Sequence, residues 1–126
     1  MGVYKDISSL ENLKKLKYLY IGGGAGIENI SMLGELKTLI VLYIENFKKV
    51  DNYTPLTTLN KLEQLIISGP ILGYSHIKDY EFLRELKNLK SVWFPNTTTR
   101  RKYTKDELTR LHNDLQNLTF IYNSSF

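Results

Sequence analysis

Apolar residues recur along this chain at the same spacing in several successive copies. The first copy places them at Ile7, Leu10, Leu13, Leu16, Leu19 and Ile21. A second and a third copy follow at steps of 23 residues, and a fourth follows at a step of 27, so four residues are inserted between Ser68 and Asp79. Six apolar positions kept through four copies predict a repeat architecture, in which each unit packs against its neighbours.

Each copy contains a helical part followed by an extended part. The first apolar positions lie three residues apart, as in a 3₁₀ turn, and the last two lie two apart, as in a half-buried strand. A short polar residue that can accept hydrogen bonds from free backbone N–H groups precedes the helical part, at Asp6, Asn29, Asn52 and Asp79. We expect one position of the helical part to be buried in every copy, at Leu13, Leu36, Leu59 and Leu86.

The strand segments share the spacing Leu-x-x-Leu-x-Leu, with other apolar residues at some positions. They are Leu16–Ile21, Leu39–Ile44, Leu62–Ile67 and Leu89–Phe94. In this the chain resembles leucine-rich repeat proteins, with short, irregular, bacterial-style repeats of about 23 residues. The resemblance implies an α/β solenoid with a curved parallel sheet of about five strands on the concave side and 3₁₀ or short helices on the convex side.

One position departs from the pattern of that family. Where the family usually has an asparagine, three residues after the strand motif, this chain has Gly24, Phe47, Pro70 and Thr97. A ladder of asparagine side chains is therefore not expected inside the turns. Their buried backbone groups must find other hydrogen-bond partners.

The end of the chain changes from 3₁₀ to α-helical spacing. Leu108, Leu111, Leu115 and Leu118 form an α-helical stripe behind a capping box that runs from Thr104 to Glu107. Matching Leu118 to Leu89 predicts a last strand over residues 118–123, centred on Ile121. We expect a single domain over residues 1–126, with repeats at approximately 4–26, 27–49, 50–76, 77–102 and 103–126.

The composition favours a small soluble domain without catalytic chemistry. The chain has 126 residues, 42% of them hydrophobic, and no cysteine. It shows no export signal and no apolar run that could span a bilayer, which favours a cytoplasmic protein with no membrane partner, although a removed signal peptide would not be visible. His76 and His112 have no further ligand at metal-binding spacing, and the glycines at 22–24 and 26 do not match a phosphate-binding loop. We expect no metal, no cofactor and no enzymatic activity.

A net charge of +4 raises the possibility of a nucleic-acid partner. The densest basic segment is Arg100, Arg101, Lys102 and Lys105, with Tyr103 among them. Such a segment is able to contact phosphates, but the other lysines lie beside acidic residues, as on an ordinary solvated surface. We favour a solvated insertion over a nucleic-acid site.

The outward positions of the strands carry the clearest functional signal. In the resembling family, the residue between the last two apolar positions points out of the concave face, here at Tyr20, Tyr43, Ile66, Trp93 and Tyr122. The outward residues two positions earlier are Tyr18, Val41, Gln64, Ser91 and Phe120, and Glu45 follows two positions after Tyr43. An exposed aromatic row is typical of protein-binding surfaces, although cross-strand aromatic pairs also stabilise a sheet by themselves.

These patterns favour a non-catalytic module that binds a protein ligand of unknown identity through its concave face. An immunity or inhibitor protein that blocks a toxin or an enzyme is one specific form of this function. Two alternatives remain open: a nucleic-acid-associated protein that uses the basic segment, and a segment of a longer solenoid. We expect a monomer unless the N-terminal edge of the sheet pairs with another chain.

Overall fold

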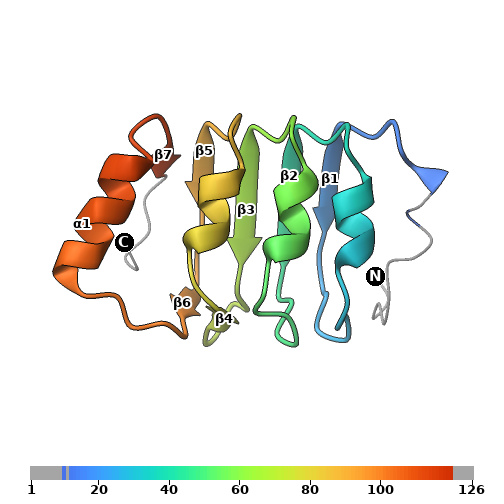
Figure 1. Ribbon diagram of the computed structural model, residues 1–126. Helices are drawn as coiled ribbons and strands as arrows, with labels where there is room; N and C mark the ends of the chain where they lie inside the picture. Colours follow the sequence, from blue (N-terminus) through green and yellow to red (C-terminus); the bar gives the residue numbers. More distant parts are fainter. Residues whose placement is uncertain (1–9, 11, 121–126) are drawn as a thin grey trace.

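The computed structural model describes residue 10 and residues 12–120, apart from the side chain of Phe120. Five parallel strands form one sheet in the order β1-β2-β3-β5-β7. They are β1 (Tyr18–Ile21), β2 (Val41–Glu45), β3 (Gln64–Ser68), β5 (Ser91–Trp93) and β7 (Thr119–Phe120). Each repeat adds one strand, which pairs in parallel with the strand of the preceding repeat (Figure 1).

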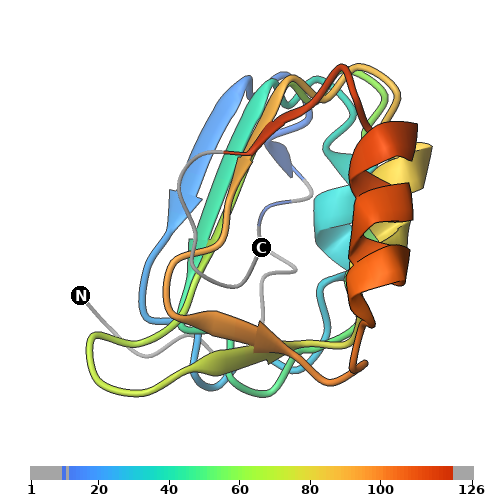
Figure 2. The same ribbon diagram turned by 90° about the vertical axis from the view of Figure 1, so that its left-hand side faces the viewer.

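Short helices cover the other side of this sheet. They are the 3₁₀ helices η2 (Ser31–Glu35), η3 (Thr54–Thr58) and η4 (Glu81–Glu85) and the α-helix α1 (Lys105–Asp114). A second, two-stranded parallel sheet consists of β4 (Ser75–Ile77) and β6 (Thr97–Thr99). It lies near the C-terminal ends of the strands of the main sheet (Figure 1). Figure 2 shows the two layers, with the strands on one side, the helices on the other and the β4–β6 pair below. The predicted α/β leucine-rich repeat solenoid is confirmed.

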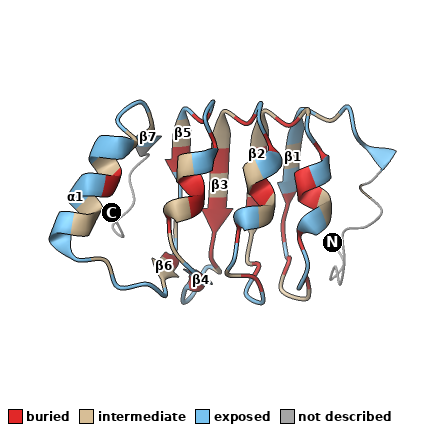
Figure 3. Ribbon diagram, viewed as in Figure 1, coloured by how far each residue is buried: buried red, intermediate tan, exposed pale blue. Residues whose placement is uncertain are grey.

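The core lies between these layers, and its buried residues recur at matching positions of successive strands and 3₁₀ helices (Figure 3). In the sheet, Leu19, Leu42, Leu65 and Val92 are aligned as the period of the sequence predicts. In the helical layer, the buried positions Leu36, Leu59 and Leu86 are confirmed.

The prediction for Leu13 is wrong, because this side chain is 46% exposed. Leu36, Leu59 and Leu86 each have a described repeat on both sides. Leu13 belongs to the first repeat of the described chain and is covered from one side alone within it. The same repeat position is therefore buried or exposed according to its neighbours.

The short polar residues cap the 3₁₀ helices as expected. The side-chain oxygens of Asn29, Asn52 and Asp79 each accept a hydrogen bond from the backbone N–H two residues later, at 2.8, 3.1 and 2.9 Å. These bonds satisfy donors that a helix of one turn leaves free. Asp6, the first member of the set, lies outside the described residues.

The turns after the strands bond to the next repeat instead of to an asparagine ladder. The backbone N–H groups of Gly24, Asn46 and Gly69 donate to carbonyl groups of the following repeat at 3.1, 2.8 and 2.9 Å. Phe47, which stands where the family usually has asparagine, has a buried ring. A Cβ atom added to Gly24 would lie 2.1 Å from that ring, so this turn requires glycine for close packing.

The C-terminal repeat has the predicted α-helix and capping box. Thr104 Oγ1 accepts from the N–H of Glu107 at 3.1 Å, and Glu107 Oε1 accepts from the N–H of Thr104 at 3.0 Å. In β7, Thr119 is the partner of Ser91, and Phe120 is the partner of Val92. The sequence match placed Phe120 beside Ser91, so the predicted alignment of this strand is one residue out. Ile121, its predicted centre, lies outside the described residues.

Candidate protein-binding face

The concave face, by which we mean the side of the five-stranded sheet that points away from the helices, carries a continuous row of large side chains. The strand alignment brings Tyr20 beside Tyr43, Tyr43 beside Ile66, and Ile66 beside Trp93. Side chains in one row of a parallel sheet are about 4.8 Å apart, so neighbours touch. Tyr20 is 53% exposed and Trp93 36%, while Tyr43 and Ile66 are half-buried between them.

Tyr20 is held in place by two contacts on this face. Its ring meets that of Tyr43 edge to face, with 4.7 Å between the ring centroids. Its hydroxyl donates to Glu45 Oε1 at 3.1 Å. Desolvation, followed by this hydrogen bond, raises the pKa of Tyr20 above its usual value.

The second row is less apolar and less uniform. Tyr18 is 66% exposed, and its aligned neighbours Val41, Gln64 and Ser91 are each half-buried. The two rows together offer aromatic area, an amide and a carboxylate on a fixed sheet. Among the described residues there is no cluster of three or more histidine, cysteine, aspartate or glutamate side chains able to hold a metal ion.

Two residues predicted for this face are not confirmed there. The partner of Phe120 is Val92, whose side chain is buried, so the predicted position of Phe120 beside Ser91 is wrong. The α-helix of the last repeat replaces the 3₁₀ helix of the others, so the number of residues between equivalent strand positions also changes. Tyr122 lies outside the described residues.

The basic segment is built largely into the fold. Arg100 Nε donates to Asp51 Oδ2 at 2.7 Å, which ties the segment to the preceding repeats. Arg101 pairs with Glu107 and with Glu81, and its guanidinium group lies 4.4 Å from the centre of the Tyr103 ring. Both arginine side chains remain exposed, at 54% and 42%, and the ion pairs that they form were not predicted from the sequence. Lys102 and Lys105 are exposed.

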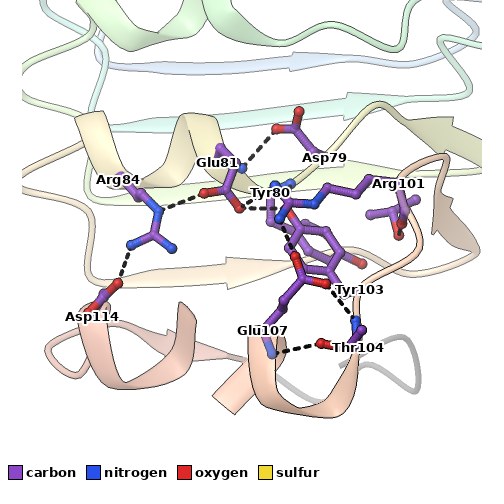
Figure 4. Close-up of polar contacts among 10 residues, drawn as sticks. Asp79, Tyr80, Glu81, Arg84, Arg101, Tyr103, Thr104, Glu107 and Asp114 are labelled. Carbon is purple, nitrogen blue, oxygen red and sulfur yellow. Dashed lines mark hydrogen bonds and ion pairs between the residues drawn. The ribbon is translucent and has the colours of Figure 1, made fainter. Parts of the chain in front are cut away.

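Figure 4 shows that this network joins η4 to α1. Glu81 accepts from Arg84 Nε at 2.8 Å and from the Tyr103 hydroxyl at 2.6 Å, and Arg84 also pairs with Asp114 of α1. Burial opposes the ionisation of Glu81, but the hydrogen bonds from Tyr103 and Arg84 outweigh it and lower the pKa. The Tyr103 ring and the two arginines thus already contact groups within the chain, whereas Lys102 and Lys105 remain exposed.

Comparison of the structure with solved structures finds leucine-rich repeat proteins. An internalin C2 from Listeria monocytogenes superposes with a TM-score of 0.67 and 22% sequence identity, over 93% of this chain and 46% of that one. The chain has the leucine-rich repeat fold. It spans less than half of the length of that internalin.

Two further solved leucine-rich repeat proteins are more distant. An internalin from Listeria monocytogenes gives a TM-score of 0.46 at 20% identity, covering 96% of this chain and 45% of that one. A leucine-rich repeat protein from Leptospira interrogans gives 0.40 at 15% identity, covering 90% and 38%. A scan of the sequence against protein-family models and a search of curated proteins each found no match.

A loop outside the predicted face of this leucine-rich repeat solenoid carries the most exposed large apolar residues of the described part of the chain. It joins β3 to β4 and contains Ile71, 93% exposed, Leu72, 89% exposed, and Tyr74, 63% exposed. The longer step between repeats located this insertion, which the sequence offers only as a second surface for the partner if the concave face is not used. Its signal was present, because Ile71 and Leu72 are large apolar residues that no repeat position needs to bury. Among the described residues, no helix is long and apolar enough to cross a membrane.

Proposed function

We propose that the chain is a protein-interaction module that binds its partner on the concave face. The row of Tyr20, Tyr43, Ile66 and Trp93 carries the proposal. A sheet face that meets only water normally alternates to polar residues, whereas three of these four are aromatic. Tyrosine and tryptophan supply rigid contact area with a polar tip, which makes them frequent anchors in protein interfaces.

The leucine-rich repeat fold supports this function without naming the ligand. A flat row of side chains on a parallel sheet suits a protein surface better than a small molecule, which needs a concave pocket that buries most of its area. Blocking a toxin or an enzyme is one form that such binding takes. The pairing of Arg100 and Arg101 with carboxylates within the chain favours a protein over a nucleic acid as the partner.

Affinity capture with two forms of the chain tests the proposal. We expect the wild type to retain a specific protein that a Trp93→Ala variant fails to retain, while a Leu13→Ser variant, which removes an exposed apolar side chain outside the face, retains it. Equal capture by wild type and Trp93→Ala would contradict the use of this face. A nucleic acid retained with a steep dependence on salt would favour the basic segment instead.

A further inference from the structure

The loop between β3 and β4 is an insertion whose apolar side chains are left in solvent. Ile71 and Leu72 are more exposed than any other large apolar residue of the described chain, and Tyr74 lies beside them. The neighbouring repeats make the same turn with four residues fewer. The insertion therefore adds apolar surface that the solenoid itself does not bury, and side chains of this kind in solvent mark interaction sites.

The base of this loop is rigidly attached to the next repeat. Gly69 N–H donates to the Pro95 carbonyl at 2.9 Å, Ser75 N–H donates to the Asn96 carbonyl at 3.0 Å, and Asn96 Nδ2 donates to the Pro70 carbonyl at 2.9 Å. The pairing of β4 with β6 continues the attachment. A Cβ atom on Gly69 would come within 1.8 Å of the Asn96 carbonyl oxygen, so the two turns are in direct contact. The exposed tip thus stands on a fixed base, which lowers the entropic cost of binding.

The loop is continuous with the concave face. Figure 2 shows the segment between β3 and β4 projecting beyond the strands on the side of the sheet that faces away from the helices. Its base bonds to Pro95 and Asn96, which lie two and three residues after Trp93, the last residue of β5. A partner that lies on the aromatic row near Trp93 therefore meets the loop at the border of the same surface.

We infer that Ile71 and Leu72 form an apolar anchor that inserts into a hydrophobic pocket of the protein partner bound on the concave face. This inference rests on the proposed function and names a second contact of the same partner. The occupant is a protein pocket because the loop borders the aromatic row, so that a protein lying on that row also reaches the loop. A lipid surface, which the exposed Lys48, Lys78 and Lys102 would attract, is an outcome of the test below. Deeply inserted apolar side chains surrounded by flatter contacts are the usual arrangement of binding hot spots.

Selection of folded binding domains tests this inference even though the natural partner is unidentified. The probe is a display library of fibronectin domains with randomised loops, selected on the immobilised wild-type chain. We expect the most enriched domains to lose about thirtyfold in affinity for an Ile71→Ser/Leu72→Ser variant and to keep their affinity for Leu13→Ser. A conservative Ile71→Leu/Leu72→Ile variant should bind like the wild type, and all variants should melt close to it.

The alternative outcomes separate this inference from the proposed function. Domains that need Trp93 but not the loop would leave the concave face as the site and overturn the anchor. Domains that need the loop but not Trp93 would support the anchor and remove the aromatic row from the site, and domains that need neither would overturn both. Loop-dependent flotation with phosphatidylglycerol vesicles, or loop-dependent dimers in sedimentation, would overturn the inference in favour of a lipid or a second copy.

Discussion

Phe47 packs its ring directly against the backbone of Gly24 in the preceding repeat. A Cβ atom at residue 24 would lie 2.1 and 2.2 Å from two carbons of that ring, distances that no real contact reaches. The ring is buried and cannot swing into solvent without opening the core. The pair thus joins neighbouring turns by a close steric fit.

Gly24→Ala should destabilise the protein by about 2 kcal/mol or more, because the ring of Phe47 must shift within a packed core. Gly23→Ala is the matched control. Gly23 has a φ of +68° but no atom within 4 Å of an added Cβ, so it should show only the conformational cost of about 1 kcal/mol. Urea unfolding of the two variants measures the difference. Equal midpoints would contradict the packing argument.

Leu36→Asp should prevent folding, whereas Leu13→Asp should be tolerated. Both residues occupy the same repeat position, but Leu36 is fully buried and Leu13 is 46% exposed. An unpaired buried carboxylate costs more than the total stability of a small domain, while an exposed one stays hydrated. Circular dichroism of the two purified variants distinguishes them. A folded Leu36→Asp protein would refute the described stacking of the repeats.

The repeat period predicted most of this fold, because an apolar residue is buried when equivalent residues of the repeats on both sides pack against it. The alignment of Leu42 with Leu65 and the caps at Asn29 and Asn52 follow from local rules that hold in every copy. Leu13 departs from the pattern because it lacks a described neighbour on one side. Phe120 departs because α1 replaces a 3₁₀ helix, which changes the path from helix to strand.

The ionic network and the apolar loop could not be predicted in the same way. The contact of Arg101 with Glu81 depends on how the segment after β6 crosses to α1, which no repeated spacing specifies. The aromatic row was predictable because its members share one repeat position, whereas Ile71 and Leu72 occur once. A feature that occurs in one copy leaves no periodic signal.

Arg101→Glu should lower the stability of the protein more than Lys102→Glu does. The first change places a third carboxylate beside Glu81 and Glu107 and removes the cation from the face of Tyr103. Lys102 is exposed, so its reversal should change the melting temperature little. Thermal unfolding of both variants in low salt measures the effect. Indistinguishable melting temperatures would mean that the network between η4 and α1 contributes nothing to stability.

The attachment of α1 should weaken in acid. The backbone N–H of Thr104, followed by the guanidinium group of Arg101, lowers the pKa of Glu107 to about 2 from its ordinary value of 4.5. A lowered carboxylate pKa contributes stability that is present above pH 4.5 and is lost as the pH falls toward 2.

Glu107→Gln keeps the capping hydrogen bonds but removes the charge, so its stability should depend less on pH across this range. Amide hydrogen exchange in α1, measured at neutral pH and near pH 3, tests this. An equal loss of protection in wild type and variant would show that another group controls the acid response.

Trp93→Ala should separate binding from folding. The inward packing of β5 is provided by Val92 and Phe94, which are 1% and 0% exposed, so removing the outward indole should change the free energy of unfolding by less than about 1 kcal/mol. Binding of the protein retained by affinity capture should weaken by about 2 kcal/mol or more, as for an aromatic hot spot. Thermal unfolding and titration calorimetry on the same variant give both quantities.

A variant that melts far below the wild type would make Trp93 a structural residue, since its indole would then stabilise the sheet through Ile66. A variant that is stable and binds at full strength would move the site to other surfaces, of which the loop with Ile71 and Leu72 comes first.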